Sequence, residues 1–397
     1  MSEFEAHLGL LPAGFMDLMP EDAEKEAYAI TRLMAIFAGY GYRRIKPPLV
    51  EFEDSLLAPG PGAALAPDTF RMMDPVSHRM LGLRADITPQ IARIVCTRLP
   101  KDVTPIRLTY ANDVLRSRAG QLRTARQFCQ VGCEIIRDDS VESYLELCVL
   151  MALGLKALGI EDITLDFTIP RALDEILSAA QLDTQTQRAV KKSIASRNRD
   201  DVAAMGDLPE GLRETLIAIL DNSGAAQKIV PLLKSLSLPP AIAAEVEKLG
   251  ALIEKFTTAL NDMGIQDVSL TCDPFEVKGF EYQGGIGFTL FSKHIRGELG
   301  RGGFYEVSFG SQAKMSAPRG GVKEKAIGFT FYMDTIRAAV MLSEETRVLA
   351  VSRDVLWPEC QKLRAQGWTI IRTDAAVSKS DPQGCTHIYI NGKIEEL

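Results

Sequence analysis

Apolar residues recur with two different periods along the first half of the chain. After Pro20 they return at intervals of three and four up to Phe37, which predicts an amphipathic helix that ends at Gly39 and Gly41. Further along, the composition is typical of strands joined by polar loops and helices. The predicted elements are strands at 106–115 and 127–136 around an arginine-rich loop at 116–126, a helix from Glu142 to Leu158, and a strand at 163–168.

The same pattern divides the chain into parts. Residues 171–266 are rich in helix formers, and their last helix carries an apolar stripe from Val246 to Met263 that is typical of packing. Strand character resumes at 268–272 and 286–295. After 343, the pattern is strand (347–352), helix (356–366), strand (369–374) and strand (386–392). We predict an α+β domain in two parts, 1–170 and 267–342, interrupted by a helical insertion at 171–266 and followed by a short α/β tail at 343–397.

Composition excludes several classes of protein. The net charge is −7, which argues against a dedicated nucleic-acid binder. The chain has no apolar run long enough to span a bilayer and no export signal at its start, so we expect a cytoplasmic protein without membrane contact. Seven scattered cysteines and four histidines show no ligand spacing, so we expect reduced thiols, no metal site and no cofactor.

Seven segments, in this order and spacing, resemble histidyl-tRNA synthetase, a class II synthetase. They are 12–20 (PAGFMDLMP), 41–51 (GYRRIKPPLVE), 83–93 (LRADITPQIAR), 115–134 (LRSR to QVGCE), 278–285 (KGFEYQGG), 302–306 (GGFYE) and 326–336 (AIGFTFYMDTI). The resemblance implies the class II aminoacyl-tRNA synthetase-like antiparallel sheet flanked by helices. The extended, proline-containing segment 41–51 resembles motif 1, which builds the homodimer interface in that family, with Pro48 as its proline.

The resemblance also implies a histidine pocket, whose matching residues are Asp86, Thr88, Arg116, Gln130, Glu134, Lys278, Tyr282 and Tyr305. At these positions Asp86 and Thr88 hold the ligand's ammonium, and Arg116 faces its carboxylate with a fork of donors. Gln130 and Glu134 lie four apart on one face of a strand and grip the ammonium and the ring. Taken singly, each residue has a plainer interpretation: Asp86 can cap a helix that begins at Thr88, Tyr282 can be a core aromatic, and Arg116 can be a solvated charge.

By the same resemblance, three departures fall on the nucleotide side. The acidic residue of motif 2 is replaced by Arg118, the arginine of motif 3 by Thr335, and the arginine that approaches the α-phosphate by Lys278. Arg337, two residues beyond Thr335, would point elsewhere on a helix. Adenylation needs positive charge where negative charge develops and carboxylates for Mg²⁺, so we predict no catalytic residues. Lys278 and Gln283 also depart from the family at the histidine end.

These traits together resemble the regulatory subunits of ATP phosphoribosyltransferase, the first enzyme of histidine biosynthesis. The resemblance implies a non-catalytic subunit that assembles with a separate short-form catalytic chain, usually as a hetero-octamer, activates it and takes part in feedback inhibition by histidine. The tail from Ser343 has seven Lys/Arg and eight Asp/Glu and so lacks the excess of positive charge that binds RNA phosphates. We therefore expect no tRNA partner. Two alternatives remain open: an active histidyl-tRNA synthetase-type ligase, and an amino-acid-sensing module whose partner is a kinase or RNA.

Overall fold

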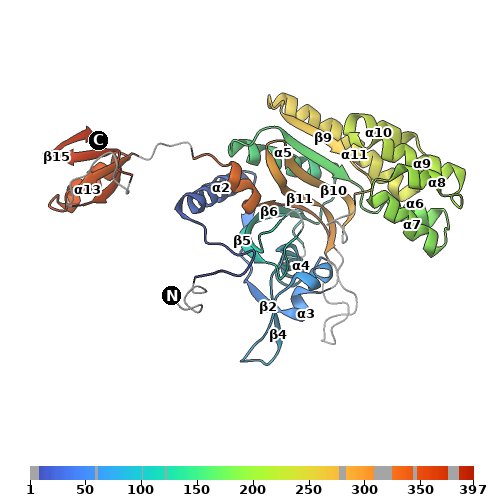
Figure 1. Ribbon diagram of the computed structural model, residues 1–397, viewed down its shortest axis with the longest axis horizontal. Coiled ribbons are helices and arrows are strands. Elements are labelled where there is room, and N and C mark those ends of the chain that lie inside the picture. Colours follow the sequence, from blue (N-terminus) through green and yellow to red (C-terminus); the bar gives the residue numbers. More distant parts are fainter. Residues whose placement is uncertain are drawn as a thin grey trace. The chain divides into compact units, whose positions relative to one another are not determined.

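The computed structural model describes residues 9–58, 61–100, 102–120, 123–276, 283–307, 324–342, 347–373 and 384–397 (Figure 1). The chain forms two compact units, Met1–Met341 and Leu342–Leu397. No helix in these described ranges is both long and apolar enough to cross a membrane.

A nine-stranded sheet forms the centre of the first unit. Its order is β1 (Arg43–Arg44), β5 (Ile106–Leu115), β6 (Gln127–Ile136), β12 (Glu324–Tyr332), β11 (Ile295–Val307), β10 (Gln283–Ser292), β7 (Ile163–Thr168), β9 (Val268–Cys272) and β8 (Gly224–Ala225). The pairs β1–β5 and β7–β9 are parallel, and the other pairs are antiparallel. The predicted antiparallel sheet and the strands at 106–115, 127–136 and 163–168 are confirmed.

Helices α2 (Pro20–Gly39) and α5 (Val141–Ala157) cover one face of this sheet. The helix predicted to end at Gly39 does so, and the one predicted from Glu142 begins one residue earlier, where the Ser140 hydroxyl accepts a hydrogen bond from the N–H of Ser143. The odd-numbered residues of β6, Cys129 to Ile135, face these helices in the main hydrophobic core. Its even-numbered residues therefore face the opposite side, where the polar side chains gather.

Segment 171–266 contains six helices among its described residues, all of which precede β9. They are α6 (Ala172–Ala179), α7 (Thr184–Ala195), α8 (Arg199–Ala204), α9 (Glu210–Asn222), α10 (Ala226–Ser235) and α11 (Pro240–Asp262). The apolar stripe of α11 is buried from Val246 to Leu260, whereas Met263 is the C-cap residue and 39% exposed. The sequence did not predict β8, because a two-residue strand has no alternation to detect and forms only against β9.

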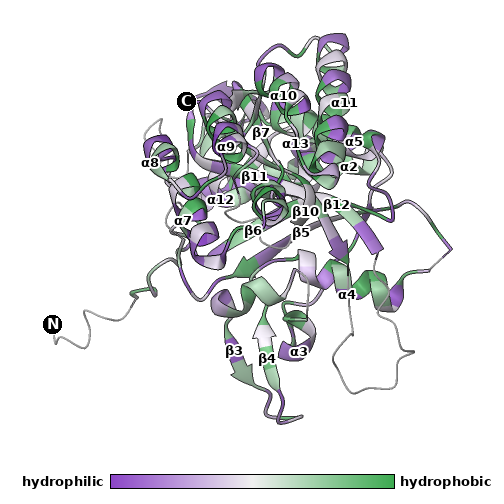
Figure 2. Cartoon of the chain, turned by 90° about the vertical axis from the view of Figure 1, so that its right-hand side faces the viewer, coloured by the Kyte–Doolittle hydropathy of each residue, from purple (hydrophilic) through white to green (hydrophobic). Residues whose placement is uncertain are grey.

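The other side of the large sheet carries α4 (Thr88–Arg98) and a second, three-stranded sheet. This small sheet has the order β2 (Val50–Phe52), β4 (Met80–Leu83), β3 (Arg71–Met73) and stands on the side away from the main helical layer (Figure 2). The short α3 (Glu53–Leu56) follows β2. The other short helical segments described in this unit are η1 (Ala63–Asp68), α12 (Met333–Ile336) and η2 (Arg337–Ala339).

The second unit holds a four-stranded sheet and α13 (Trp357–Ala365). The strand order is β14 (Thr369–Arg372), β13 (Val348–Val351), β15 (His387–Ile390) and β16 (Lys393–Glu396). The prediction of a single strand at 386–392 was wrong at its end. Asn391 and Gly392 both have positive φ and form a two-residue hairpin turn between Ile390 and Lys393.

Candidate functional site

The candidate site lies on the face of the large sheet that carries the even-numbered residues of β6. Gln130 is fully buried and Glu134 is 2% exposed, and both point to the side of α4. The predicted placement of these two residues on one strand face is confirmed. Tyr305 of β11, 2% exposed, reaches the same place from two strands away.

Glu134 accepts hydrogen bonds from two tyrosines. The hydroxyl of Tyr110 donates to Oε1 over 3.2 Å, and that of Tyr305 donates to Oε2 over 3.0 Å. Burial raises the pKa of Glu134 well above its ordinary value, while the two tyrosine donors act in the opposite direction. The carboxyl group of Glu134 is thus buried and held in place by two hydroxyl donors.

Two glycines make room for this arrangement. A Cβ atom built on Gly132 would lie 2.6 Å from the Tyr110 hydroxyl oxygen, and one on Gly328 would collide with the Glu134 carboxylate. Both glycines are paired with the site residues in the register of the sheet, because Gly132 stands opposite Tyr110 and Gly328 stands opposite Glu134. Any other residue at either position would displace the polar groups above it.

Asp86 and Gln130 form the second part of the site. Gln130 Nε2 donates to Asp86 Oδ2 over 2.7 Å, and Gln130 Oε1 accepts from the N–H of Ile87 over 3.2 Å. The other carboxylate oxygen of Asp86 accepts from the N–H of Thr88 over 2.9 Å, at the start of α4. Asp86 therefore does satisfy a free N–H of the first helical turn, as the plainer interpretation expects, and also accepts a hydrogen bond from Gln130.

Arg116 lies beside this pair. Its Nε donates to the carbonyl oxygen of Ala85 over 3.3 Å, next to Asp86 in the chain, and its guanidinium lies 5.2 Å from the ring of Phe128. Across the described part of the chain, no hydrogen bond engages its two terminal nitrogens. The structure thus brings Asp86, Thr88, Arg116 and Gln130 together, and Arg116 presents free donors.

Lys278 and Tyr282 lie outside the described residues. The backbone of Gln283, at the start of β10, pairs with that of Tyr305. Within the described residues no group of three His, Cys, Asp or Glu side chains could hold a metal ion.

At two of the positions where the sequence departs from the synthetase motifs, 118 and 335, the side chains contact other residues of this chain. Arg118 forms an exposed ion pair with Asp68, over 3.3 Å. Thr335, on α12, accepts a hydrogen bond through its hydroxyl from Arg123, over 3.4 Å. Arg337 points away from the site, as predicted, toward Asp22 and Glu26 of α2.

Arg123 is a residue that the sequence analysis did not single out. Its Nε donates to Asp334 Oδ2 over 2.8 Å, and its guanidinium stacks 3.7 Å from the ring of Tyr332 and 4.8 Å from that of Phe128. The side chain is 12% exposed. Arg123, which belongs to the 116–126 loop, thus contacts both Asp334 and Thr335 of α12. Among several arginines in that loop, nothing in the sequence distinguishes it.

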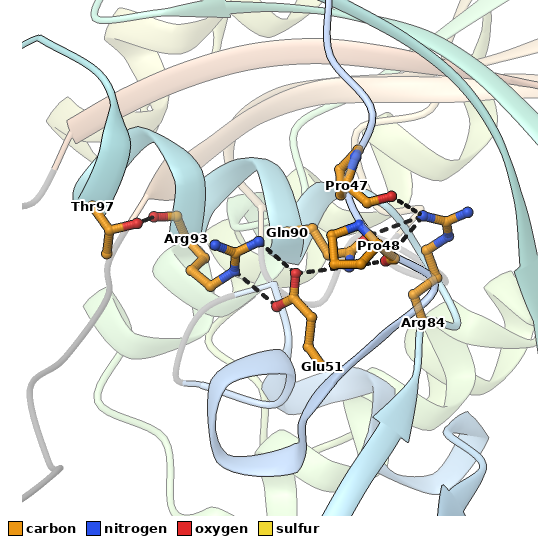
Figure 3. A network of polar contacts seen from close by, with 7 residues as sticks. All are labelled: Pro47, Pro48, Glu51, Arg84, Gln90, Arg93 and Thr97. Atoms are coloured by element: carbon orange, nitrogen blue, oxygen red, sulfur yellow. Dashed lines mark hydrogen bonds and ion pairs between the residues drawn. The ribbon is translucent and has the colours of Figure 1, made fainter.

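Pro48 belongs to a polar network that ties the 41–51 segment to α4 (Figure 3). Its carbonyl oxygen accepts from Gln90 Nε2 over 2.7 Å and from the buried Arg84 over 3.2 Å. Gln90 also donates to Glu51, which forms an ion pair of 2.5 Å with Arg93. Desolvation lowers the pKa of the Arg84 guanidinium, whose charge is offset by carbonyl acceptors. The segment's backbone is therefore fixed from within the chain.

Pro48 and the apolar residues that follow it are exposed. Pro47 is buried, whereas Pro48 is exposed and Leu49 and Phe52 are exposed large apolar residues.

The comparisons of this chain with known proteins agree on one family. Residues 14–336 match the histidyl-tRNA synthetase family. A structure described as an ATP phosphoribosyltransferase regulatory subunit/histidyl-tRNA synthetase from Bacillus halodurans matches with a TM-score of 0.76 at 20% identity, over 95% of this chain and 96% of that chain. A chain of an ATP phosphoribosyl transferase complex from Thermotoga maritima matches with a TM-score of 0.55 at 16% identity, over 78% and 97%. The predicted class II synthetase-like fold is confirmed, and the match over residues 14–336 shows that the chain belongs to the histidyl-tRNA synthetase family.

Sequence identity to curated proteins identifies one family within this class. The ATP phosphoribosyltransferase regulatory subunit of Rhodospirillum centenum is 40% identical over 394 residues, which are 98% of this chain and 97% of that protein. The chain belongs to the family of ATP phosphoribosyltransferase regulatory subunits.

Proposed function

We propose that this chain is a non-catalytic regulatory subunit that binds histidine between Asp86 and Glu134 and changes the activity of a separate ATP phosphoribosyltransferase chain. The observation that carries the proposal is the buried carboxylate of Glu134, held by two tyrosines in a protein of this family. Histidine is both an effector expected in histidine biosynthesis and a ligand whose ring offers an N–H to such an acceptor.

The arrangement of charge favours an amino acid. Asp86, with one carboxylate oxygen turned to Gln130, supplies an anion near the ligand's ammonium. Arg116 supplies free donors for its carboxylate, and Glu134 and Tyr305 accept and orient its ring. Thr88, Lys278 and Tyr282 complete the proposed set by their place in the sequence. No cofactor or metal is part of this proposal.

Loss of adenylation is supported by the contacts at the nucleotide side. Position 118, where binding of Mg²⁺ would need a carboxylate, holds an arginine that forms an ion pair with Asp68. Thr335 cannot clamp a phosphate, and Arg123 near it is engaged by Asp334. An active ligase is therefore the weaker alternative.

The proposed partners are a short-form catalytic chain and a second copy of this chain. The Thermotoga maritima structure is named as an ATP phosphoribosyl transferase complex, which supports the first. The exposed Pro48, Leu49 and Phe52, on a backbone fixed by Arg84 and Gln90, suit the second. We propose a hetero-octamer built on these homodimers, located in the cytoplasm and independent of tRNA.

Native mass and activity test the proposal together. We expect the chain alone to be a dimer without histidine-dependent pyrophosphate exchange, and its mixture with the catalytic chain to form a larger complex with increased phosphoribosyltransferase activity that histidine inhibits. Pyrophosphate exchange by the chain alone would establish the ligase alternative. Co-purification with RNA or a kinase, without an effect on the phosphoribosyltransferase, would establish the sensing-module alternative.

A further inference from the structure

Tyr110, Gly132 and Thr330 form a row across three neighbouring strands. Gly132 of β6 stands opposite Tyr110 on one side and opposite Thr330 on the other. Because glycine has no side chain, the Tyr110 ring lies over Gly132 and its hydroxyl comes within 2.7 Å of Thr330 Oγ1. Tyr110 is fully buried and Thr330 is 7% exposed. Neither residue belongs to the histidine-binding set implied by the sequence.

The proton count fixes the direction of these hydrogen bonds. A tyrosine hydroxyl has one proton, and Tyr110 donates it to Glu134 Oε1 when that carboxylate is ionised. The hydroxyl of Thr330 must then donate to Tyr110. With Tyr305 donating to Oε2, both carboxylate oxygens have one donor and each keeps a lone pair for a ligand. Thr330, Tyr110 and Glu134 therefore form a chain of hydrogen bonds that ends at the Glu134 carboxylate, on the sheet face that also carries Gln130.

We propose that Tyr110, oriented by Thr330, is a positioning and specificity-determining residue that keeps Glu134 an acceptor, so that the pocket selects a ring that carries an N–H. This inference rests on the proposed function. A protonated Glu134 would turn one of its two acceptor oxygens into an O–H donor, and the preference for a ring that carries an N–H would weaken.

The surroundings of Glu134 make these donors important. The titratable groups that face it are the Tyr110 hydroxyl from β5, the Tyr305 hydroxyl from β11 and the Asp86 carboxylate from the segment before α4. Across the residues described, no cation forms an ion pair with it. Burial and Asp86 raise the pKa of Glu134, and only the hydroxyl donors oppose them. Removing one donor should therefore make the carboxyl protonate at higher pH.

The test is histidine binding by titration calorimetry from pH 5 to 9, with native protein and Tyr110→Phe. We expect Tyr110→Phe to weaken binding at neutral pH about tenfold or more, since a hydrogen bond to a charged group is lost. We also expect the pH at which affinity declines on acidification to move upward. Selectivity for histidine over 2-thienylalanine, a ring of similar size without N–H, should fall. A merely structural tyrosine would lower affinity at every pH without moving this midpoint.

Thr330→Val provides a second variant in case Tyr110→Phe does not fold. It leaves Glu134 and Tyr110 in place and should move the midpoint in the same direction by a smaller amount. Tyr42→Phe is the matched control, because Tyr42 is a buried tyrosine that donates to Glu146 over 2.8 Å on the other face of the sheet. Its affinity and pH profile should equal those of the native protein.

Failure of this inference differs from failure of the proposed function. If the native chain binds no histidine, the proposed function is wrong and the inference falls with it. If the native chain binds histidine and the folded variants keep its pH profile and selectivity, the role of Tyr110 is wrong and the histidine site stands.

Discussion

The side-chain amide of Gln130 joins the Asp86 carboxylate to the backbone that precedes α4. Nε2 donates to Asp86 Oδ2 over 2.7 Å, and Oε1 accepts from the N–H of Ile87 over 3.2 Å. Only one orientation of the amide satisfies both bonds, so the contact fixes where the Asp86 carboxylate faces. Asp86 and Gln130 thus act as a unit in the proposed site.

Gln130→Leu tests this unit. It removes the donor to Asp86 and leaves the N–H of Ile87 without its partner, so we expect histidine affinity to fall about tenfold and the free energy of unfolding to fall by about 1–3 kcal/mol. Gln127→Leu is the matched control, because Gln127 is exposed at the start of the same strand and its side chain forms, among the described residues, only a 3.5 Å contact with Asp113. Equal effects of the two substitutions would contradict the assignment.

Substitutions of the two motif 2 arginines, Arg116 and Arg118, should have very different effects on histidine affinity. Arg116→Lys keeps the charge but loses the planar fork beside Asp86, so we expect histidine affinity to fall about tenfold. Arg118→Ala removes an exposed ion pair with Asp68, which is worth less than about 1 kcal/mol, and should leave affinity unchanged. Calorimetric titration of both variants checks this. A loss confined to Arg118→Ala would reverse our assignment.

The effects of substituting Arg123 and Asp334 on the free energy of unfolding should depend strongly on each other. Their side chains are 12% and 16% exposed, and removal of either leaves the other charge partly buried and unpaired. We expect each single alanine variant to lose about 3 kcal/mol in denaturant unfolding, and the double variant to lose clearly less than the sum. The exposed pair Arg199–Asp221 is the control and should show little coupling. Strict additivity at Arg123 and Asp334 would show that the ion pair does not anchor the loop.

Glu134→Gln should weaken histidine binding while it stabilises the unliganded fold. A carboxyl whose pKa is raised in the folded state contributes stability below its unfolded pKa and loses it as pH rises through the folded pKa. Ionisation of Glu134 therefore lowers the stability of the fold, and the neutral amide of the variant avoids this loss, which is about 1 kcal/mol. Unfolding at pH 7 and pH 4 measures it, and we expect the advantage of the variant to vanish at the lower pH. Assembly with the catalytic chain should be unchanged. A variant that is less stable at pH 7 would contradict the assigned pKa direction.

The pocket residues were predictable where their position follows from strand periodicity. Gln130 and Glu134 are four residues apart in a clear strand, so they share a face whatever the rest of the fold does. Arg123 meets Asp334 across 211 residues of sequence, and no local pattern selects it from its neighbours. Tyr110 looks like an ordinary core residue of β5, and its role depends on the sheet register that places Gly132 and Thr330 beside it.

Two errors in the fold have local causes. The Asn391-Gly392 dipeptide is a strong hairpin signal, but the strand β16 after it is short and mostly polar, so the sequence pattern predicts one strand in place of a hairpin. Met263 continues the period of α11 but stands at its C-cap, where the helix no longer faces the core.

The central claim is that histidine binds in this chain and that its binding is coupled to the catalytic chain. The most direct test is titration of histidine into the assembled complex with and without phosphoribosyl pyrophosphate and ATP, for native protein and Glu134→Gln. We predict that the substrates weaken histidine binding to the native complex by about 5- to 150-fold, and that Glu134→Gln weakens it further. Identical histidine affinity with and without substrates, or an affinity that Glu134→Gln leaves unchanged, would contradict the account.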